Sequence, residues 1–188
     1  MRKLIASLFV SIDGYLVAPN EDMTWVTQNF NDEMGQYAGS LQQSMGAILL
    51  GRVTYEIMTN AWPNWGDDVP GAKEMNRVPK HVVSRTLKAA SWGKYENAHV
   101  IREEVEKEID ALKKQPGGDI VIYGSGKLVS SLTNQGLIDE YHLLVHPVIL
   151  GGGKLLFDDV TRRVPLELVR SQSFKNGVVV SYYTPHKG

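Results

Sequence analysis

The chain contains no cysteine among its 188 residues. This absence excludes disulfides, thiolate metal sites and cysteine nucleophiles, and it fits a reducing compartment, so we expect a cytoplasmic protein. The chain also lacks a strong excess of basic or acidic residues, because 20 basic and 21 acidic residues leave a formal net charge of -1. Such a balance offers no footprint for nucleic acid, so any phosphate that the protein binds must be held by local groups.

Long apolar runs are also missing. None approaches the roughly 20 residues that cross a bilayer, and residues 11–14 interrupt the apolar start too early for a secretory signal. The five histidines lie at positions 81, 99, 142, 146 and 186, without the spacing of metal ligands. No repeat or linker divides the chain. We therefore expect no membrane span, no metal and a single domain covering residues 1–188.

Short apolar or β-branched runs bounded by Gly, Pro or Asn predict strands. They lie at residues 3–10, 47–50, 81–83, 99–101, 120–123 and 141–145. Several are continuously apolar, which is typical of strands covered on both faces in a mostly parallel sheet. Helical spacing appears at residues 103–114 and 127–134. The pattern therefore predicts an α/β fold with three layers, α-β-α.

The C-terminal part has a different pattern. Residues 166–173 and 178–183 flank an Asn-Gly turn signal at 176–177. Such a pair of runs predicts an antiparallel hairpin, so we expect a mixed, mostly parallel sheet that ends in a C-terminal antiparallel hairpin.

Two strand ends carry an arginine and a hydroxyl. Gly51, Arg52 and Thr54 follow one buried run at a helix start, where free N–H groups suit a phosphate. Ser84 and Arg85 follow the next run. Because ligands of open α/β sheets lie beyond the carboxyl ends of strands, the two arginines can converge on a 2′-phosphate, which favours NADPH over NADH. The alternative is a glycine turn with two unrelated surface arginines.

A third strand end reads Gly124-Ser125-Gly126-Lys127-Leu128 and leads into a helix. Glycines there let the backbone approach a pyrophosphate, as in a dinucleotide-type turn. The segment lacks the third glycine of the Rossmann fingerprint, and Ser125 is not part of a Gly-x-Ser-x-Gly elbow, which argues against an acyl hydrolase. A purely structural glycine turn is the alternative.

Two carboxylates are candidates for proton chemistry. Asp13 precedes Gly14, and Asp22 lies three residues before Trp25. The alternatives are a turn pair for Asp13 and a helix N-cap for Asp22.

In this order, the segments resemble the dihydrofolate reductase superfamily, particularly its branch related to the reductase domain of bacterial riboflavin biosynthesis. The similarity spans nearly the whole chain. It rests on residues 11–14 (SIDG), 50–55 (LGRVTY), 83–86 (VSRT), 124–126 (GSG), 136–140 (GLIDE) and 147–151 (PVILG).

The resemblance implies a dihydrofolate reductase-like fold that binds NADPH through the Gly-Arg-x-Thr, Ser-Arg and Gly-Ser-Gly segments, with Ala6 and Ser7 near the nicotinamide. It also implies a homodimer and hydride transfer to a small pyrimidine- or pteridine-type substrate, such as a phosphoribosylaminopyrimidine. Asp22, or Asp13 as second choice, would assist proton delivery. Two alternatives stay open: dihydrofolate reductase activity, and a nucleotide-binding module without efficient catalysis.

Overall fold

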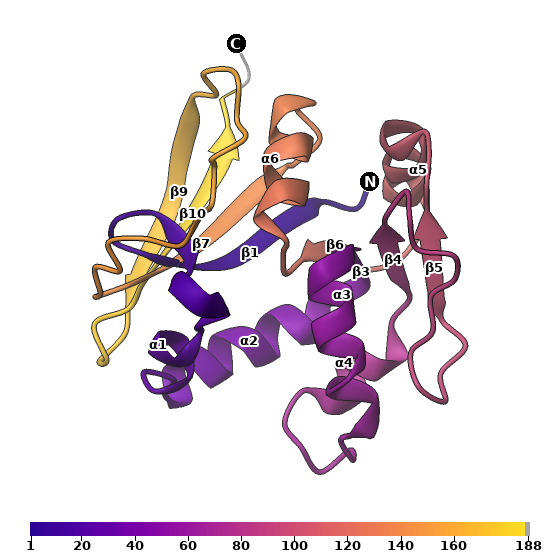
Figure 1. The fold of residues 1–188 in the computed structure, drawn as a ribbon, viewed down its shortest axis with the longest axis horizontal. Helices are drawn as coiled ribbons and strands as arrows, with labels where there is room; N and C mark the ends of the chain where they lie inside the picture. Colours follow the sequence, from indigo (N-terminus) through magenta and orange to yellow (C-terminus); the bar gives the residue numbers. More distant parts are fainter. Residues whose placement is uncertain (187–188) are drawn as a thin grey trace.

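The computed structural model describes residues 1–186 and contains one eight-stranded sheet with the order β5-β4-β3-β6-β1-β7-β10-β9 (Figure 1). The strands are β1 (Leu4–Ser11), β3 (Met45–Gly51), β4 (Lys80–Val83), β5 (Ala98–Ile101), β6 (Asp119–Ile122), β7 (Glu140–His146), β9 (Leu166–Ser173) and β10 (Val179–Pro185). Pairing is parallel from β5 to β7, and antiparallel between β7, β10 and β9. The predicted mixed sheet and its C-terminal hairpin are therefore confirmed.

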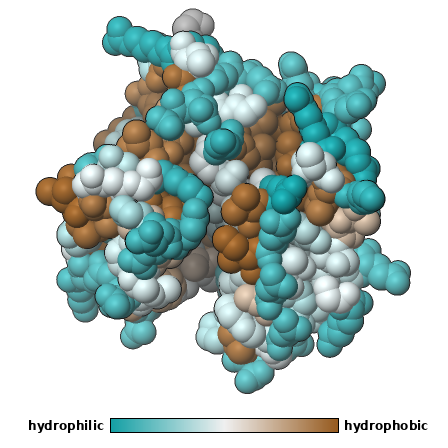
Figure 2. All heavy atoms as spheres, in the orientation of Figure 1, coloured by the Kyte–Doolittle hydropathy of each residue, from teal (hydrophilic) through white to brown (hydrophobic). Residues whose placement is uncertain are grey.

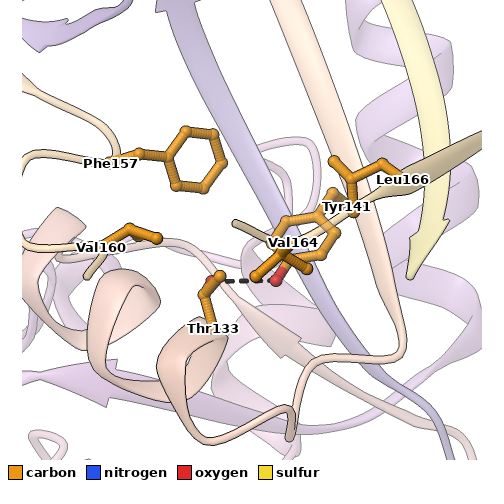
Figure 3. A pocket seen from close by; sticks show the side chains of 6 residues that line it. All are labelled: Thr133, Tyr141, Phe157, Val160, Val164 and Leu166. Carbon is orange, nitrogen blue, oxygen red and sulfur yellow. Dashed lines mark hydrogen bonds between the residues drawn. The ribbon is translucent and has the colours of Figure 1, made fainter. Parts of the chain in front are cut away.

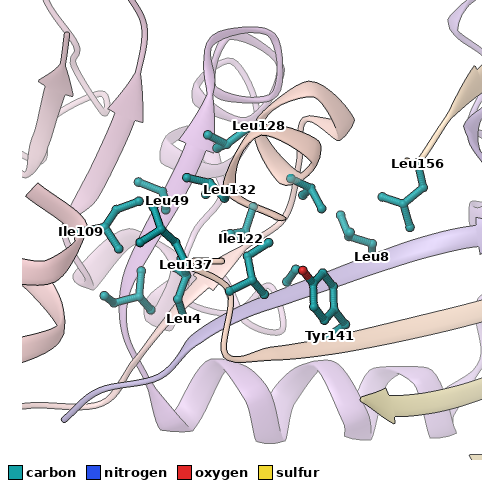
Figure 4. Close-up of a cluster of buried hydrophobic side chains, with 14 of the residues drawn as sticks. Leu4, Leu8, Leu49, Ile109, Ile122, Leu128, Leu132, Leu137, Tyr141 and Leu156 are labelled. Carbon is teal, nitrogen blue, oxygen red and sulfur yellow. The ribbon is translucent and has the colours of Figure 1, made fainter. Parts of the chain in front are cut away.

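Helices α5 (Val105–Lys114) and α6 (Gly126–Asn134) cover one face of the sheet. Ile109 and Leu112 from α5 and Leu132 from α6 pack against alternate residues of the central strands, among them Leu4 and Leu49 (Figure 4). These side chains are almost completely buried. Both predicted helices are confirmed within two residues.

The opposite face carries α2 (Asp32–Ser44), α3 (Arg52–Thr59) and α4 (Ala72–Arg77), whose Leu41, Tyr55 and Met75 meet the other side of the strands. With helices on both faces, the three-layer prediction is confirmed. Sequence spacing did not predict α2, because its sequence contains two glycines and few apolar residues. Its start is capped by Asn31, whose side-chain oxygen accepts the Met34 N–H at 3.0 Å.

Short elements complete the structure. The strands β2 (Tyr15–Val17) and β8 (Lys154–Leu155) pair in a separate two-stranded ribbon. The remaining helices are η1 (Pro19–Glu21), α1 (Thr24–Thr27) and η2 (Trp62–Asn64). Within residues 1–186, no helix is both long enough and apolar enough to cross a membrane.

Candidate active site

The carboxyl ends of β3 and β6 meet at the point where the chain changes faces of the sheet. The helix after β3, α3, packs on one face, and the helix after β6, α6, packs on the other. The backbone N–H of Gly51 donates to the carbonyl of Gly124 at 3.1 Å. In open α/β sheets such a switch point opens a crevice beyond the strand ends, where ligands bind. Seen from the side of α3, the surface is hollowed between α1 and α3 (Figure 2).

Glycines stand where these two strand ends touch. A Cβ on Gly51 would lie 2.6 Å from Ser125 Oγ, and one on Gly124 would lie 2.9 Å from Thr54 Oγ1. Gly124 also has a φ of 134°, which disfavours any other residue. The glycines therefore bring Thr54 and Ser125, both predicted cofactor contacts, to the same place.

The start of α6 is where the structure suits a pyrophosphate. Gly126, Lys127 and Leu128 form its first turn, whose backbone N–H groups have no acceptor within the helix. The Leu128 side chain is buried in the core and the Lys127 side chain is exposed, so Leu128 offers a ligand its backbone alone. A Cβ on Gly126 would lie 2.7 Å from Leu16 of β2, so the ribbon borders this turn.

Arg52 joins the start of α3 to the segment after β4. Its Nη1 donates to Thr86 Oγ1 and its Nε to Glu56 Oε1, both at 2.8 Å, and about half of its side chain is exposed. Arg85 directly precedes Thr86 in the sequence, and its side chain is exposed. The two predicted phosphate-binding arginines thus follow the ends of adjacent parallel strands.

Ser84 has a structural role that the sequence did not indicate. Its side chain is buried, and its Oγ accepts the backbone N–H groups of Thr86 at 3.3 Å and Leu87 at 3.0 Å. These bonds shape the loop that presents Arg85.

Asp13 holds two segments together. It accepts a hydrogen bond from Ser11 Oγ at 2.7 Å, and from the backbone N–H groups of Leu150 at 3.1 Å and Gly151 at 2.8 Å. The Ser11 hydroxyl and these two N–H groups lower the pKa of Asp13 to about 2. A carboxyl that stays ionised is a poor proton donor, so these contacts match the turn alternative for Asp13.

Asp22 is exposed, and its Oδ1 accepts the Thr24 N–H at 2.8 Å where α1 begins. Its hydrogen bonds with Thr24 lower its pKa. These are the contacts of the helix-start alternative, although Met23 occupies the N-cap position itself. Both predicted carboxylates thus have a lowered pKa, and their part in proton delivery stays a prediction.

Ala6 and Ser7 lie on opposite faces of β1. The Ala6 side chain is completely buried in the core on the α6 side of the sheet. Ser7 faces α2, where its Oγ lies 2.8 Å from Tyr37 Oη. Tyr37 in turn lies 2.9 Å from His142 Nδ1. The sequence did not indicate that Tyr37 and His142 contact Ser7. A histidine inside an otherwise apolar strand was the one feature that could have pointed to His142.

Two concavities lie elsewhere. One of about 250 Å³ lies on the α6 side of the sheet and is lined by Thr133, Tyr141, Phe157, Val160, Val164 and Leu166 (Figure 3). The Thr133 and Tyr141 hydroxyls in it bond each other at 2.9 Å, and its other lining side chains are apolar. The other, of about 320 Å³, includes Trp25 and His146. Within residues 1–186, no group of three or more His, Asp or Glu side chains is arranged to hold a metal ion.

Comparison with known proteins identifies the fold. YyaP of Bacillus subtilis (strain 168), described as uncharacterized, is 34% identical over 97% of this chain and 94% of its own length. The deaminase and 5-amino-6-(5-phosphoribosylamino)uracil reductase of Thermotoga maritima superimposes with a TM-score of 0.71 at 15% identity, over 98% of this chain and 57% of that one.

Dihydrofolate reductase from Enterococcus faecalis, solved with NADP(H), superimposes with a TM-score of 0.64 at 14% identity, over 98% of this chain and 97% of that one. These two likenesses show the dihydrofolate reductase-like fold. The model of the RibD C-terminal domain matches residues 2–180, nearly the whole chain, and the chain therefore belongs to the RibD C-terminal domain family.

Proposed function

We propose that this chain is an NADPH-dependent reductase that transfers hydride to a small pyrimidine- or pteridine-type substrate. The observation that carries the proposal is the switch point at the carboxyl ends of β3 and β6, where the first turn of α6 begins on one face of the sheet and Arg52 begins α3 on the other. The family supports a reductase-like role, and two similar folds bear names that include a uracil reductase and an NADP(H) complex.

The residues present suit such a cofactor. The backbone N–H groups of the α6 first turn would hold the pyrophosphate, because a helix N-terminus offers free donors and a partial positive charge. Arg52 and Arg85, at the ends of adjacent strands, would hold the 2′-phosphate. NADPH, when bound, supplies the hydride. The protein's own part is to orient both reactants and to deliver a proton.

The proposal is tested by following NADPH oxidation with 5-amino-6-(5-phosphoribosylamino)uracil and with 7,8-dihydrofolate as separate acceptors. Oxidation with the uracil supports the riboflavin-type reductase, and oxidation with dihydrofolate supports the alternative activity. Binding of NADPH without turnover of either compound would favour a nucleotide-binding module.

Arg52→Ala tests the phosphate contact. Loss of a charge-assisted bond of about 1.5–3 kcal/mol predicts that NADPH binding weakens roughly 10- to 100-fold, while NADH binding changes little. Arg77→Ala is the matched control, because Arg77 is an exposed arginine that lies before the amino end of β4, whereas Arg85 follows the carboxyl end of the same strand. Equal losses for both cofactors would remove the argument for a 2′-phosphate contact.

The homodimer and the cytoplasmic location that we expected stay predictions. Sedimentation of the purified chain tests the first.

A further inference from the structure

A continuous chain of hydrogen bonds runs from the surface to the middle of β1. Lys3 Nζ bonds Glu140 Oε2 at 2.9 Å, and Glu140 Oε1 lies 2.8 Å from His142 Nε2. His142 Nδ1 lies 2.9 Å from Tyr37 Oη, which lies 2.8 Å from Ser7 Oγ. Lys3 is more than half exposed, whereas Ser7 and His142 are buried. The chain therefore links solvent to an interior serine through α2 and two neighbouring strands.

The carboxylate fixes the direction of every bond in this chain. Ionised Glu140 can only accept, so His142 Nε2 carries a proton and donates it. In a neutral imidazole Nδ1 is then an acceptor, so the Tyr37 hydroxyl donates to His142. Tyr37 Oη accepts in turn from the Ser7 hydroxyl. At rest the hydroxyl protons point toward His142, and the free lone pairs of Ser7 face away from it.

One added proton reverses the chain. When His142 is charged, both of its nitrogens donate, so Tyr37 must accept from Nδ1 and turn its own proton to Ser7. The Ser7 hydroxyl is then free to donate outward. Burial raises the pKa of Tyr37, so Tyr37 passes a proton on and does not ionise at neutral pH.

Some neighbours of His142 favour its protonated, charged form, and others disfavour it. Burial lowers its pKa, and Arg170 of β9 and Lys3 act in the same direction, whereas Glu140 raises it. The ring centroids of Tyr182 of β10 and His142 lie 4.4 Å apart. The guanidinium group of Arg170 lies over the Tyr182 ring, 3.7 Å from its centroid. With Tyr37 of α2, these are the charged and titratable groups that the structure places against His142.

We propose that His142, Tyr37 and Ser7 form a proton relay that supplies the proton accompanying the hydride. The inference rests on the proposed function. Hydride brings an electron pair to a carbonyl or imine carbon and leaves a pair on the oxygen or nitrogen. That atom takes the Ser7 proton, Ser7 takes the Tyr37 proton, and Tyr37 takes the His142 Nδ1 proton. After the product leaves, a proton returns from solvent to Nδ1 through Ser7 and Tyr37, because Nε2 keeps its own proton toward Glu140. Each turnover consumes one NADPH and one proton.

Tyr37→Phe cuts the relay at its centre and keeps the ring. With 5-amino-6-(5-phosphoribosylamino)uracil as the probe, we expect kcat to fall on the order of 100-fold, because positioned proton transfer contributes about 10²- to 10⁴-fold. KM and NADPH affinity should stay within about twofold, since no binding group is removed. The wild-type kcat should fall as pH rises above the pKa of His142, and the variant should lose this dependence.

Tyr141→Phe is the matched control. Tyr141 neighbours His142 on β7 but faces the other side of the sheet, where its hydroxyl bonds Thr133 at 2.9 Å. This variant loses a comparable buried hydrogen bond without touching the relay, so its kcat should remain near that of the wild type.

A second readout does not depend on turnover. ¹⁵N NMR of histidine-labelled protein should show neutral His142 protonated at Nε2, with an Nδ1 signal that moves when Tyr37 becomes Phe. A proton on Nδ1, or a Tyr37→Phe enzyme with wild-type kcat and pH profile, overturns the relay while leaving the reductase proposal intact. A wild-type chain that fails to bind NADPH overturns the proposed function and the relay together.

Discussion

Gly51→Ala tests whether the ends of β3 and β6 are held in contact. An added Cβ would lie 2.6 Å from Ser125 Oγ, 3.2 Å from its backbone N and 3.3 Å from its Cβ. Rotation of the serine relieves the first clash, but the other two require the strand ends to separate slightly. Overpacking of this kind costs about 1–3 kcal/mol.

The unfolded chain offsets part of that cost. Gly51 has a φ of -75°, which alanine adopts without strain, so the substitution also gains about 0.4–1 kcal/mol by restricting the unfolded state. With the middle value of each range, about 2 kcal/mol of cost and about 0.7 kcal/mol of gain, we expect a net loss of about 1.3 kcal/mol. Since 1.4 kcal/mol is tenfold in affinity, a similar loss in binding would weaken NADPH about tenfold.

Gly39→Ala supplies the control. Gly39 lies inside α2, and a Cβ there would meet no atom within 4 Å. This change should stabilise the protein by about 0.5–1 kcal/mol and leave NADPH binding unchanged. Urea unfolding followed by tryptophan fluorescence measures both variants. Equal stability and equal NADPH affinity in Gly51→Ala and wild type would refute the contact between the strand ends.

Two further predictions concern pH. Burial lowers the pKa of Lys80 to about 7, with its Nζ 2.8 Å from the Asn76 carbonyl and 4.5 Å from the Trp92 ring. The unfolded chain therefore holds more protons above this pH, so urea unfolding should show stability rising on the order of 1 kcal/mol between about pH 7 and 9, discounted for screening, and Lys80→Met should abolish the rise. Asp13 stabilises the fold above its ordinary pKa of 3.8, and this contribution is lost as pH falls toward 2. Circular dichroism should therefore show a smaller acid-induced loss of stability in Asp13→Asn, and identical acid transitions would contradict the role of Asp13.

The sequence predicted the central sheet because its evidence is local. Apolar runs such as residues 120–123 and the Asn-Gly signal at 176–177 each mark an element without reference to the rest of the chain. The segments that we predict to bind phosphate could be located in the same way, since each directly follows a strand.

The proton relay could not be predicted in this way. Ser7, Tyr37 and His142 are separated by 30 and 105 residues and meet only after β1 pairs with β7 and α2 packs on the sheet. The helix that carries Tyr37 shows too few apolar residues to stand out in the sequence. The contact of the Asp22 carboxylate with the Thr24 N–H at the start of α1 was offered by the sequence only as an alternative to its predicted role in proton delivery.

Titration of the wild-type protein with NADPH and NADH, followed by quenching of its tryptophan fluorescence, tests whether the protein binds a dinucleotide and prefers the one with a 2′-phosphate. We expect saturable NADPH binding at least about tenfold tighter than that of NADH, the equivalent of one charge-assisted contact. If neither cofactor bound at millimolar concentration, the switch point at the ends of β3 and β6 would not be a dinucleotide site, and the proposed reductase function would be contradicted.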